Sequence, residues 1–392
     1  MNQFRPAERV TRIRPSGIRA VQIEAERLER QGIKIYNFSI GRPDFDTPEH
    51  IKAAAKAALD AGRVHYTHNA GIVELRQAIA QKLSAENGLI VDPEQGVLVT
   101  AGSCEAVCLA VLGYVNPGDE VLIPTPAWTN YVAATLLAGG VPVEVPARRE
   151  DGFLPDPDVL RRRVTGRTRL LILNSPNNPT GVVYPEPLLR KIAEVAEHSG
   201  LLVLSDEIYE RLLCGDTPHL PFARLPGMGE RTLLINGLSK TFSMTGWRIG
   251  YLAGPPNLVQ PLVRIHQNLV ASACSFVQWG AAEAIGGPSD CVSLMVAEYR
   301  LRRDLVWETL SAVPGIRLVR PQGAFYAFPG WERSDLSAEE MAQRLLRETH
   351  VAVVPGTVFG PGGEGHVRLS YCCATADVKE GVARMAAFFE RL

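Results

Sequence analysis

The feature that most constrains the fold of this chain is a regular alternation of short apolar runs with longer amphipathic segments. Seven runs of five or six residues are rich in Val, Ile and Leu: GVLVT (96–100), EVLIP (120–124), VPVEVP (141–146), RLLILN (169–174), LLVLS (201–205), TLLIN (232–236) and GYLAG (250–254). Apolar spacing near 3.6 predicts helical partners at 103–114, 127–138, 156–163, 185–198 and 256–269. Because most crossovers are long enough to join parallel neighbours, the pattern predicts an α/β fold whose large domain has a mainly parallel seven-stranded sheet between helices.

The pattern changes near residue 277, and this change predicts a second, smaller α+β domain. A long helical stretch continues through residue 311, and the later segments predict strands near 316–319 and 324–328, a helix at 337–349, a strand at 366–370 and a closing helix near 376–391. An amphipathic helix at 20–31 precedes the apolar run IYNFSIG, so we expect the N-terminal segment to pack with this domain. The predicted organisation is a large domain at 46–285 and a small domain built from both termini, 1–45 and 286–392.

The charge balance argues against nucleic acid or a membrane surface as the partner. The 392 residues include 41 Lys+Arg and 42 Asp+Glu, a net charge of −1, without a long basic run. No stretch approaches the roughly 20 apolar residues that cross a bilayer, and the N-terminus lacks the apolar part of a signal peptide, so we expect a cytoplasmic protein. The seven cysteines lack C-x-x-C spacing, so we expect reduced thiols and no metal site.

A single lysine follows one of the predicted strands. Lys240 lies in NGLSKTFSMTGWRIGY (236–251), after the run TLLIN and among small, apolar and hydroxyl residues. Open α/β sheets bind ligands at the carboxyl ends of their strands. Desolvation by apolar neighbours lowers the pKa of an ε-amine, which makes the amine a nucleophile toward a carbonyl, or a base. Taken alone, the segment leaves open an ordinary surface lysine in a loop.

Three further strand ends carry polar residues of complementary chemistry. Asp206 follows the run LLVLS with Tyr209 three residues later, the turn LNSPNNPTG (173–181) follows another strand, and Gly102 with Ser103 begin a helix after a third. An aspartate or a serine at such a position is also a common helix cap. The free N–H groups at the start of a helix bind anions. Together, the four strand ends predict a site for a cofactor that carries a phosphate and a carbonyl.

These motifs resemble those of the class I/II aminotransferases in the fold-type I family of pyridoxal-phosphate enzymes. The matching segments are S-K-x-F-x-M-T-G-W-R, N-x-P-x-N-P-T-G, S-D-E-x-Y and V-R-L-S-Y, between SIGRPDFDTP (39–48) and RLSY (368–371). The resemblance implies pyridoxal 5'-phosphate as cofactor. It also implies an aminotransferase, an enzyme that moves the α-amino group of an amino acid to a 2-oxo acid by a ping-pong aldimine/ketimine mechanism.

By this resemblance, Lys240, Asp206 and Tyr209 would be catalytic. Lys240 would bind the cofactor covalently and later shuttle a proton between the substrate Cα and C4′ of the cofactor. Asp206 would keep the pyridine nitrogen protonated, which makes the ring an electron sink. Tyr209 and Asn178 would hydrogen-bond the phenolic oxygen of the ring, and Trp128 would stack on the ring.

The resemblance also implies a phosphate site, a substrate site and a dimer. The phosphate ligands would be the backbone N–H groups of Gly102, Ser103 and Cys104, the Ser239 hydroxyl, Arg248 and Tyr66 of the partner subunit. We therefore expect a homodimer with shared active sites. The substrate site would consist of Arg368, which binds the α-carboxylate bidentately, together with Gly41, Asn178 and Trp128.

Two positions depart from the family pattern. Gly237 stands three residues before the lysine, where the family often places a serine on the phosphate, and Arg42 replaces the acidic residue of the usual G-E-P-D-F loop. Arg42 is either a fixed positive charge near the substrate or an exposed loop residue. Cys372 and Cys373, which follow the arginine motif, are assigned to packing.

We expect the substrate side chain to be neutral, aromatic or long. Aspartate-using members of the resembled family carry a second basic residue in or shortly after the phosphate-loop helix, but no lysine or arginine occurs between residues 99 and 140 here. A buried carboxylate without a partner is unfavourable. Trp128, Tyr131, Tyr66 and Ile18 would instead line a roomy, largely apolar pocket.

Other classes of protein fit the sequence less well. GPGGEG (360–365) matches the dinucleotide pattern G-x-G-x-x-G, but a strand-like segment follows it where a Rossmann unit needs a helix. A ligand-sensing domain of a transcription regulator would carry a basic DNA-binding domain ahead of the family-like sequence. The alternative that stays open is another pyridoxal-phosphate enzyme of a biosynthetic pathway: an eliminase, a cyclase or an oxidase. The amino donor, the keto acceptor and the pathway are not determined by the sequence.

Overall fold

A seven-stranded sheet forms the centre of the computed structural model, which describes residues 4–392. The strand order is β2-β8-β7-β6-β5-β3-β4, and only β8 runs antiparallel to its neighbours. The strands are β2 (Val97–Thr100), β3 (Glu120–Thr125), β4 (Val141–Pro146), β5 (Thr168–Asn174), β6 (Leu202–Asp206), β7 (Thr232–Gly237) and β8 (Gly250–Ala253). The seven apolar runs are therefore the seven strands, and the predicted fold class is confirmed.

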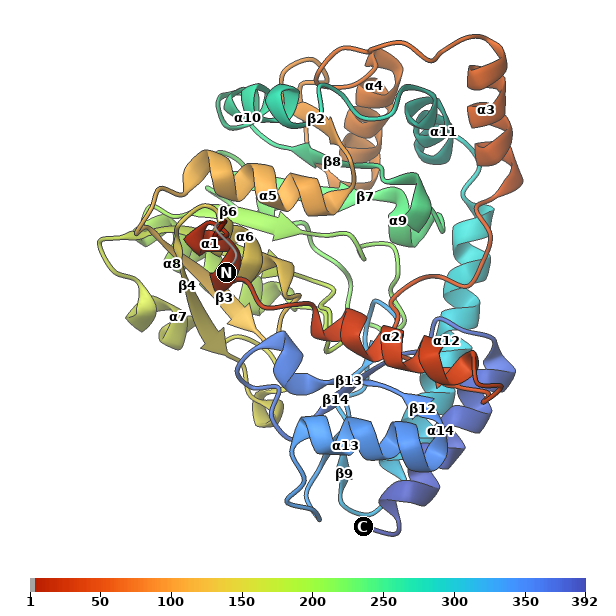
Figure 1. Cartoon of the computed structure of the whole chain (residues 1–392). Coiled ribbons are helices and arrows are strands. Elements are labelled where there is room, and N and C mark those ends of the chain that lie inside the picture. Colours follow the sequence, from red (N-terminus) through yellow and green to blue (C-terminus); the bar gives the residue numbers. More distant parts are fainter. Residues whose placement is uncertain (1–3) are drawn as a thin grey trace.

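Helices cover both faces of this sheet (Figure 1). Successive side chains of a strand point to opposite faces, so on β5 Leu170 and Ile172 belong to one apolar core whereas Leu171 and Leu173 belong to another. The first core contains α5 (Ser103–Tyr114), α6 (Asn130–Leu137) and α10 (Pro256–Leu269). The opposite face packs against α7 (Pro157–Arg163), α8 (Glu186–His198), α4 (Val73–Lys82) and α11 (Ser275–Gly286), with α3 (Glu49–Asp60) packed on α11. Burial on both faces explains why the strands are nearly continuous apolar runs.

The remaining elements come from both ends of the chain. β14 (Val367–Ser370) lies between β10 (Tyr326–Ala327) and β13 (Val354–Pro355), β1 (Tyr36–Asn37) pairs with β12 (Val351–Ala352), and β9 (Ile316–Arg317) pairs with β11 (Gly330–Trp331). The helices of this part are α1 (Glu8–Arg12), α2 (Gly17–Glu29), α12 (Asp290–Ser311), α13 (Ala338–Arg344) and α14 (Thr375–Phe389). Ala25 of α2 is buried with Leu346 and Ala352, and Figure 1 shows α2 beside the C-terminal strands. Helix α2 thus packs with the C-terminal elements as expected, whereas α1 contacts α6 beside the large sheet, and the proposed domain boundaries stay predictions.

Two predicted helices differ in their extent. The stretch from residue 277 to 311 is two helices, because Gly287 and Pro288 interrupt it between α11 and α12; proline lacks the backbone donor and glycine is conformationally free. The helix predicted at 337–349 ends its α-helical part at Arg344 and continues as a π-helical turn over Leu345–Thr349. Neither change affects the sheet.

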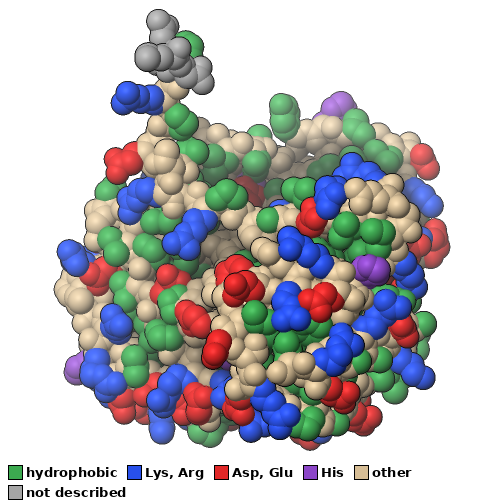
Figure 2. Space-filling model, turned by 60° about the horizontal axis from the view of Figure 1, so that its bottom comes forward, with side chains coloured by type: hydrophobic (Ala, Val, Ile, Leu, Met, Phe, Trp, Pro, Cys, Tyr) green, Lys and Arg blue, Asp and Glu red, His purple; other side chains and the backbone are tan. Residues whose placement is uncertain are grey.

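The surface agrees with a nearly neutral protein. Figure 2 shows acidic and basic side chains interspersed over the described residues of one face. Across residues 4–392, no helix combines the length and the apolar character that crossing a membrane requires.

The candidate residues gather because the parallel strands end at one edge of the sheet. Asp206 is the last residue of β6, and Lys240 lies in the short helix α9 (Leu238–Thr241) directly after β7. Asn178 follows β5, Ser103 begins α5 after β2, and Trp128 follows β3. The fold therefore brings together strand-end residues that are as much as 137 positions apart in the chain, from Ser103 to Lys240.

Candidate active site

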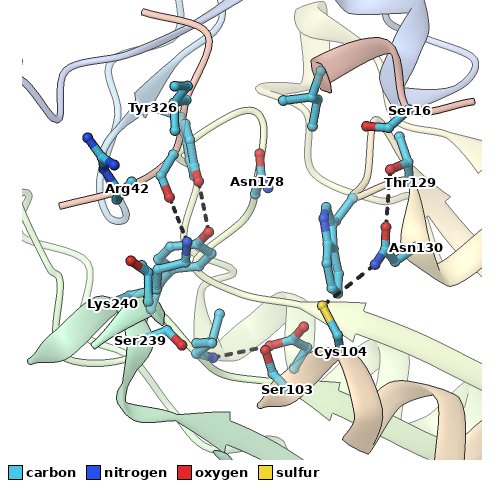
Figure 3. Close-up of a pocket in the computed structure, with 18 of the residues that line it drawn as sticks. Ser16, Arg42, Ser103, Cys104, Thr129, Asn130, Asn178, Ser239, Lys240 and Tyr326 are labelled. Atoms are coloured by element: carbon cyan, nitrogen blue, oxygen red, sulfur yellow. Dashed lines mark hydrogen bonds between the residues drawn. The ribbon is translucent and has the colours of Figure 1, made fainter. Parts of the chain in front are cut away.

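A cavity of about 610 Å³ lies at this edge of the sheet. Figure 3 shows Lys240, Asn178 and Tyr326 reaching the cavity from different segments of the chain. The predicted site residues that line it are Gly41, Ser103, Cys104, Trp128, Asn178, Asp206, Tyr209, Ser239, Lys240, Arg248 and Arg368. The structure thus brings eleven of the thirteen predicted residues together; the other two are Gly102, which lies directly behind the cavity wall, and Tyr66.

Lys240 has the properties of a nucleophilic amine. Its Nζ donates a hydrogen bond to the backbone oxygen of Gly41 at 2.6 Å. Burial lowers the pKa of Lys240 to about 8, and the positive charges of Arg368 and Arg248 add to this effect. The unprotonated amine, which is the form that attacks a carbonyl carbon, is therefore far more populated near neutral pH than in an ordinary lysine.

Asp206 is a buried carboxylate with two fixed donors. Only 2% of the residue is exposed, its Oδ2 accepts a hydrogen bond from the Tyr131 hydroxyl at 2.7 Å, and its Oδ1 accepts one from the Ile208 N–H at 3.2 Å. Burial raises the pKa of Asp206 to about 6, although both hydrogen bonds oppose the rise. A buried carboxylate of this kind is a strong acceptor for a protonated ring nitrogen.

The start of α5 has the features of an anion-binding site. Ser103 and Cys104 are the first two residues of the helix, so their N–H groups have no acceptor within it. Gly102, at φ +86°, differs from the expectation because its N–H donates to the Thr100 oxygen at 2.8 Å. Its contribution is space, since a Cβ at this position would meet Nη2 of Arg248 at 2.6 Å. The guanidinium of Arg248 therefore lies against the loop that leads into the helix.

Arg368 is a buried cation without a carboxylate partner among the described residues. It is 1% exposed on β14, and Nη1 donates to Oδ1 of Asn178 at 3.2 Å, while Nη2 donates to the backbone oxygen of Ser39. The Nε atom has no hydrogen-bond partner in the described part of the chain. A buried guanidinium with free hydrogen-bonding capacity fits a planar carboxylate from a bound molecule.

Two tyrosines have roles that the sequence did not indicate. Tyr326 lines the cavity from β10, and its hydroxyl lies 2.9 Å from that of Tyr209, within hydrogen-bonding distance. Tyr131 lines the cavity as expected, but the residue is 1% exposed and its hydroxyl donates a hydrogen bond to Asp206, a role that was not expected. Both tyrosines lie in apolar segments. Apolar periodicity predicts that such residues are buried, but it does not predict the hydrogen bonds of their hydroxyl groups.

Tyr66 and Arg42 lie at the surface. Tyr66 is 92% exposed and does not line the cavity of its own chain. Arg42 is exposed and also lines the cavity, across from Cys104 in Figure 3. Both alternatives for Arg42 therefore hold at once: it is an exposed loop residue, and its charge is near the mouth of the site.

A buried network of charges holds the segment that follows Asp206. Glu210 forms an ion pair with Lys82 and accepts a hydrogen bond from Asn236 Nδ2 at 2.7 Å, and Glu207 lies 2.9 Å from Nε2 of His219. Burial alone would lower the pKa of His219, but the two carboxylates outweigh burial and raise it. Because Asn236 belongs to β7, this network links the ends of β6 and β7, which carry the carboxylate and the lysine of the site.

Comparisons with known proteins agree with this arrangement. Residues 33–385 match the family described as aminotransferase class I and II. The chain is 42% identical over 381 residues to aromatic-amino-acid aminotransferase 2 of Thermococcus litoralis and to the aspartate aminotransferase of Pyrococcus abyssi, and each alignment covers 97% of both chains. It is also 42% identical over 385 residues to the aspartate/prephenate aminotransferase of Thermus thermophilus, again over 97% of each chain.

Solved structures give the same result. The aspartate aminotransferase from Thermus thermophilus with maleate superposes with a TM-score of 0.93 at 41% identity, and the comparison covers 98% of this chain and 100% of that one. The aromatic aminotransferase from Pyrococcus horikoshii OT3 superposes with a TM-score of 0.89 at 43% identity, over 94% and 98% of the two chains. Fold and site thus define an α/β enzyme of fold-type I. The chain belongs to the class I and II aminotransferases, and it is an enzyme that transfers amino groups.

Replacing Asp206 with Asn should stabilise the cofactor-free protein above about pH 6. The pKa of Asp206 is raised from 3.8 to about 6, so the folded state binds the proton more tightly than the unfolded state, and stability is lost as the pH rises through this window. At pH 8 the variant should gain on the order of 1–3 kcal/mol in the free energy of unfolding, and the gain should shrink as the pH falls toward about 4. Urea unfolding of both proteins across this pH range measures the effect.

The exposed Asp216 provides the matched control, because Asp216→Asn should leave the free energy of unfolding nearly unchanged at every pH. Equal stability of the wild type and Asp206→Asn at pH 8 would contradict a cost for the buried charge.

Proposed function

We propose that the cavity binds pyridoxal 5'-phosphate and that the enzyme moves the α-amino group of an amino acid to a 2-oxo acid. One observation carries this proposal: Lys240, Asp206 and the free N–H groups of α5 converge on a single cavity. The amine would react with the carbonyl of the cofactor, the carboxylate would bind its ring nitrogen, and the N–H groups would bind its phosphate. Such convergence is the expected signature of a preorganised site.

Two features of the cavity support the fit. The loop before α5 leaves room for an anion beside Arg248, because Gly102 has no side chain to fill it. The unpartnered Nε of the buried Arg368 offers a second anion site in the same cavity. One cofactor phosphate and one substrate carboxylate would use these two separate sites.

The residues around the ring positions would hold and tune the cofactor. When bound, pyridoxal phosphate supplies an electron-accepting ring that stabilises negative charge at the substrate Cα. Asp206, oriented by Tyr131, would accept a hydrogen bond from the protonated ring nitrogen. Tyr209 and Asn178 would hydrogen-bond the ring oxygen, and Trp128 would pack on the face of the ring.

Lys240 would have two successive roles. Its amine would first hold the cofactor at the carbonyl carbon and, after the substrate amine releases it, would move the proton of the substrate Cα. A pKa of about 8 suits this second role, because a general base works best when its pKa is near the working pH. Arg368 and Asn178 would fix the substrate carboxylate, which leaves the Cα hydrogen directed at one amine.

The choice of donor depends on the wall of the cavity next to α5. Relatives of equal identity are named for aromatic amino acids and for aspartate, so the family alone does not select the donor. The part of the wall that Cys104, Trp128 and Asn130 form carries no fixed charge: burial raises the pKa of the Cys104 thiol, and Nδ2 of Asn130 approaches its sulfur at 3.7 Å. We therefore propose a donor with a neutral, aromatic or long side chain.

A homodimer would complete the site. Tyr66 and Val64 are exposed on one loop and Leu269 and Val270 are exposed just before Ala271, and Nδ2 of Asn69 joins these two segments by donating to the oxygen of Ala271 at 2.7 Å. An exposed apolar patch of this kind is typical of a subunit interface. We also propose that the enzyme is cytoplasmic.

Borohydride reduction of the protein loaded with pyridoxal phosphate should fix the cofactor on the peptide that contains Lys240. Mass mapping of the digest measures this, and label on any other lysine would overturn the assignment. Lys240→Ala should still bind the cofactor through Asp206, Arg248 and the start of α5, but its turnover should fall by several orders of magnitude. Replacing the exposed Lys191 with Ala should change neither labelling nor turnover.

Mixed dimers should show that Tyr66 acts on the site of the partner subunit. Lys240→Ala and Tyr66→Ala should each reduce activity, the second at limiting cofactor. In a heterodimer of the two variants both changes fall in one site and the other site is intact, so mixing the proteins should restore activity. A Tyr66→Ala enzyme that keeps full activity at limiting cofactor would contradict the shared site.

Aspartate should be a poor amino donor. Its kcat/KM should lie at least about tenfold below that of the best neutral or aromatic donor, a difference of roughly 1.4 kcal/mol, because α5 provides no cation for the distal carboxylate. A donor screen with 2-oxoglutarate, pyruvate and oxaloacetate as acceptors measures the ratio. If aspartate is the best donor and Arg42→Ala abolishes that preference, then Arg42 supplies the missing charge.

A further inference from the structure

A partly buried carboxylate and a buried histidine brace the loop that leads into α5. Oε2 of Glu105 accepts a hydrogen bond from the Ala101 N–H at 2.5 Å, and Oε1 lies 2.8 Å from Nδ1 of His266 on α10. The His266 side chain is 0% exposed and that of Glu105 is 11% exposed. Neither residue lines the cavity, so the pair acts on the loop from behind.

The pair has features that are unfavourable by themselves. Nε2 of His266 is buried and has no hydrogen-bond partner among the described residues. A carboxylate in the first turn of α5 is favourable for the helix dipole, but it also adds negative charge beside the N–H groups that would bind the phosphate. The unpartnered histidine nitrogen is unfavourable by itself, so its presence points to a geometric role for the pair.

The bonds of the loop show what the pair fixes. The Gly102 N–H donates to the Thr100 oxygen at 2.8 Å, and the Thr100 hydroxyl donates to the Gly102 oxygen at 3.1 Å. Glu105 closes the turn by accepting a hydrogen bond from the Ala101 N–H. The N–H groups of Ser103 and Cys104 are then left without an acceptor at the start of the helix, and both residues line the cavity.

His266 connects this turn to a rigid neighbour. α10 packs along α5 in the same apolar core, and the two helices are also joined at the far end, where the Tyr114 hydroxyl donates to the Leu258 oxygen at 2.7 Å. The contact between His266 and Glu105 is thus one of two polar links between the helices, and it is the one beside the loop. Its loss would free the loop without separating the helices.

We propose that Glu105 and His266 are positioning residues for the cofactor phosphate. They hold the loop of residues 100–104 so that the N–H groups of Ser103 and Cys104 and the guanidinium of Arg248 meet the phosphate together. The inference rests on the proposed function, because it takes the phosphate of pyridoxal phosphate as the anion bound at α5.

The test compares two ligands that differ only in the phosphate. Dissociation constants of pyridoxal phosphate and of pyridoxal are measured by absorbance titration of the cofactor-free full chain. In Glu105→Ala the value for pyridoxal phosphate should rise about tenfold, while the value for pyridoxal stays within about twofold, because only the phosphate uses the loop. Glu105→Gln keeps an oxygen acceptor for the Ala101 N–H and should stay within about threefold of the wild type for both ligands.

His266→Phe and Tyr114→Phe form a matched pair. His266→Phe keeps a buried ring but removes the contact with Glu105, so it should weaken pyridoxal phosphate selectively by about threefold to tenfold. Tyr114→Phe removes the other polar link between α5 and α10 and should leave both dissociation constants unchanged. Pyridoxal binding shows that each variant is folded around its site, and His266→Phe keeps the proposal testable if Glu105→Ala does not fold.

The outcomes separate this inference from the proposed function. If the wild type binds pyridoxal as tightly as pyridoxal phosphate, the phosphate site at α5 is wrong. If the wild type prefers pyridoxal phosphate but Glu105→Ala keeps the full preference, or binds the phosphate more tightly, the positioning role is overturned. The positioning role is also overturned if His266→Phe weakens the binding of pyridoxal phosphate and of pyridoxal equally, or if Tyr114→Phe weakens pyridoxal phosphate as much as His266→Phe does. A general loosening of the two helices would then explain the effect.

Discussion

The removal of water from ionisable groups at one edge of the sheet is the constraint on which the rest of the structure depends. Lys240, Asp206 and Arg368 all lie where burial disfavours their charged forms. The pKa of Lys240 is therefore lowered and that of Asp206 is raised, and both shifts favour the uncharged form. A loose scaffold would relax and let water reach these groups. The seven-stranded sheet, covered by helices on both faces, prevents this, so the free energy of apolar burial maintains an unfavourable arrangement of charges.

Fixed polar contacts then determine the geometry within that scaffold. The ion pair of Lys82 and Glu210 and the hydrogen bond from Asn236 connect the ends of β6 and β7. The pair of Glu105 and His266 connects the loop before α5 to α10. All four ionisable residues lie behind the cavity rather than in it. Preorganisation of this kind reduces the reorganisation that binding or catalysis would otherwise require.

Much of the site could be predicted because its chemistry is attached to strand ends. Lys240, Asp206 and Ser103 each follow an apolar run, and parallel strands carry such residues to the same edge. The prediction was incomplete where a polar atom lies inside an apolar segment. Tyr326 and Tyr131 belong to such segments, and only the packing shows that one hydroxyl meets Tyr209 and the other meets Asp206.

The sequence by itself determined the sheet and its helical layers, because apolar periodicity is local and records burial directly, and it indicated the candidate residues at the ends of the strands. Only the tertiary structure decided how those residues act. It showed that the Gly102 N–H is already bonded, so that this glycine provides space instead of a donor. It also placed His266 against Glu105, 161 residues away in the chain. Such contacts depend on how two helices pack in three dimensions, and that packing has no period or motif in the sequence.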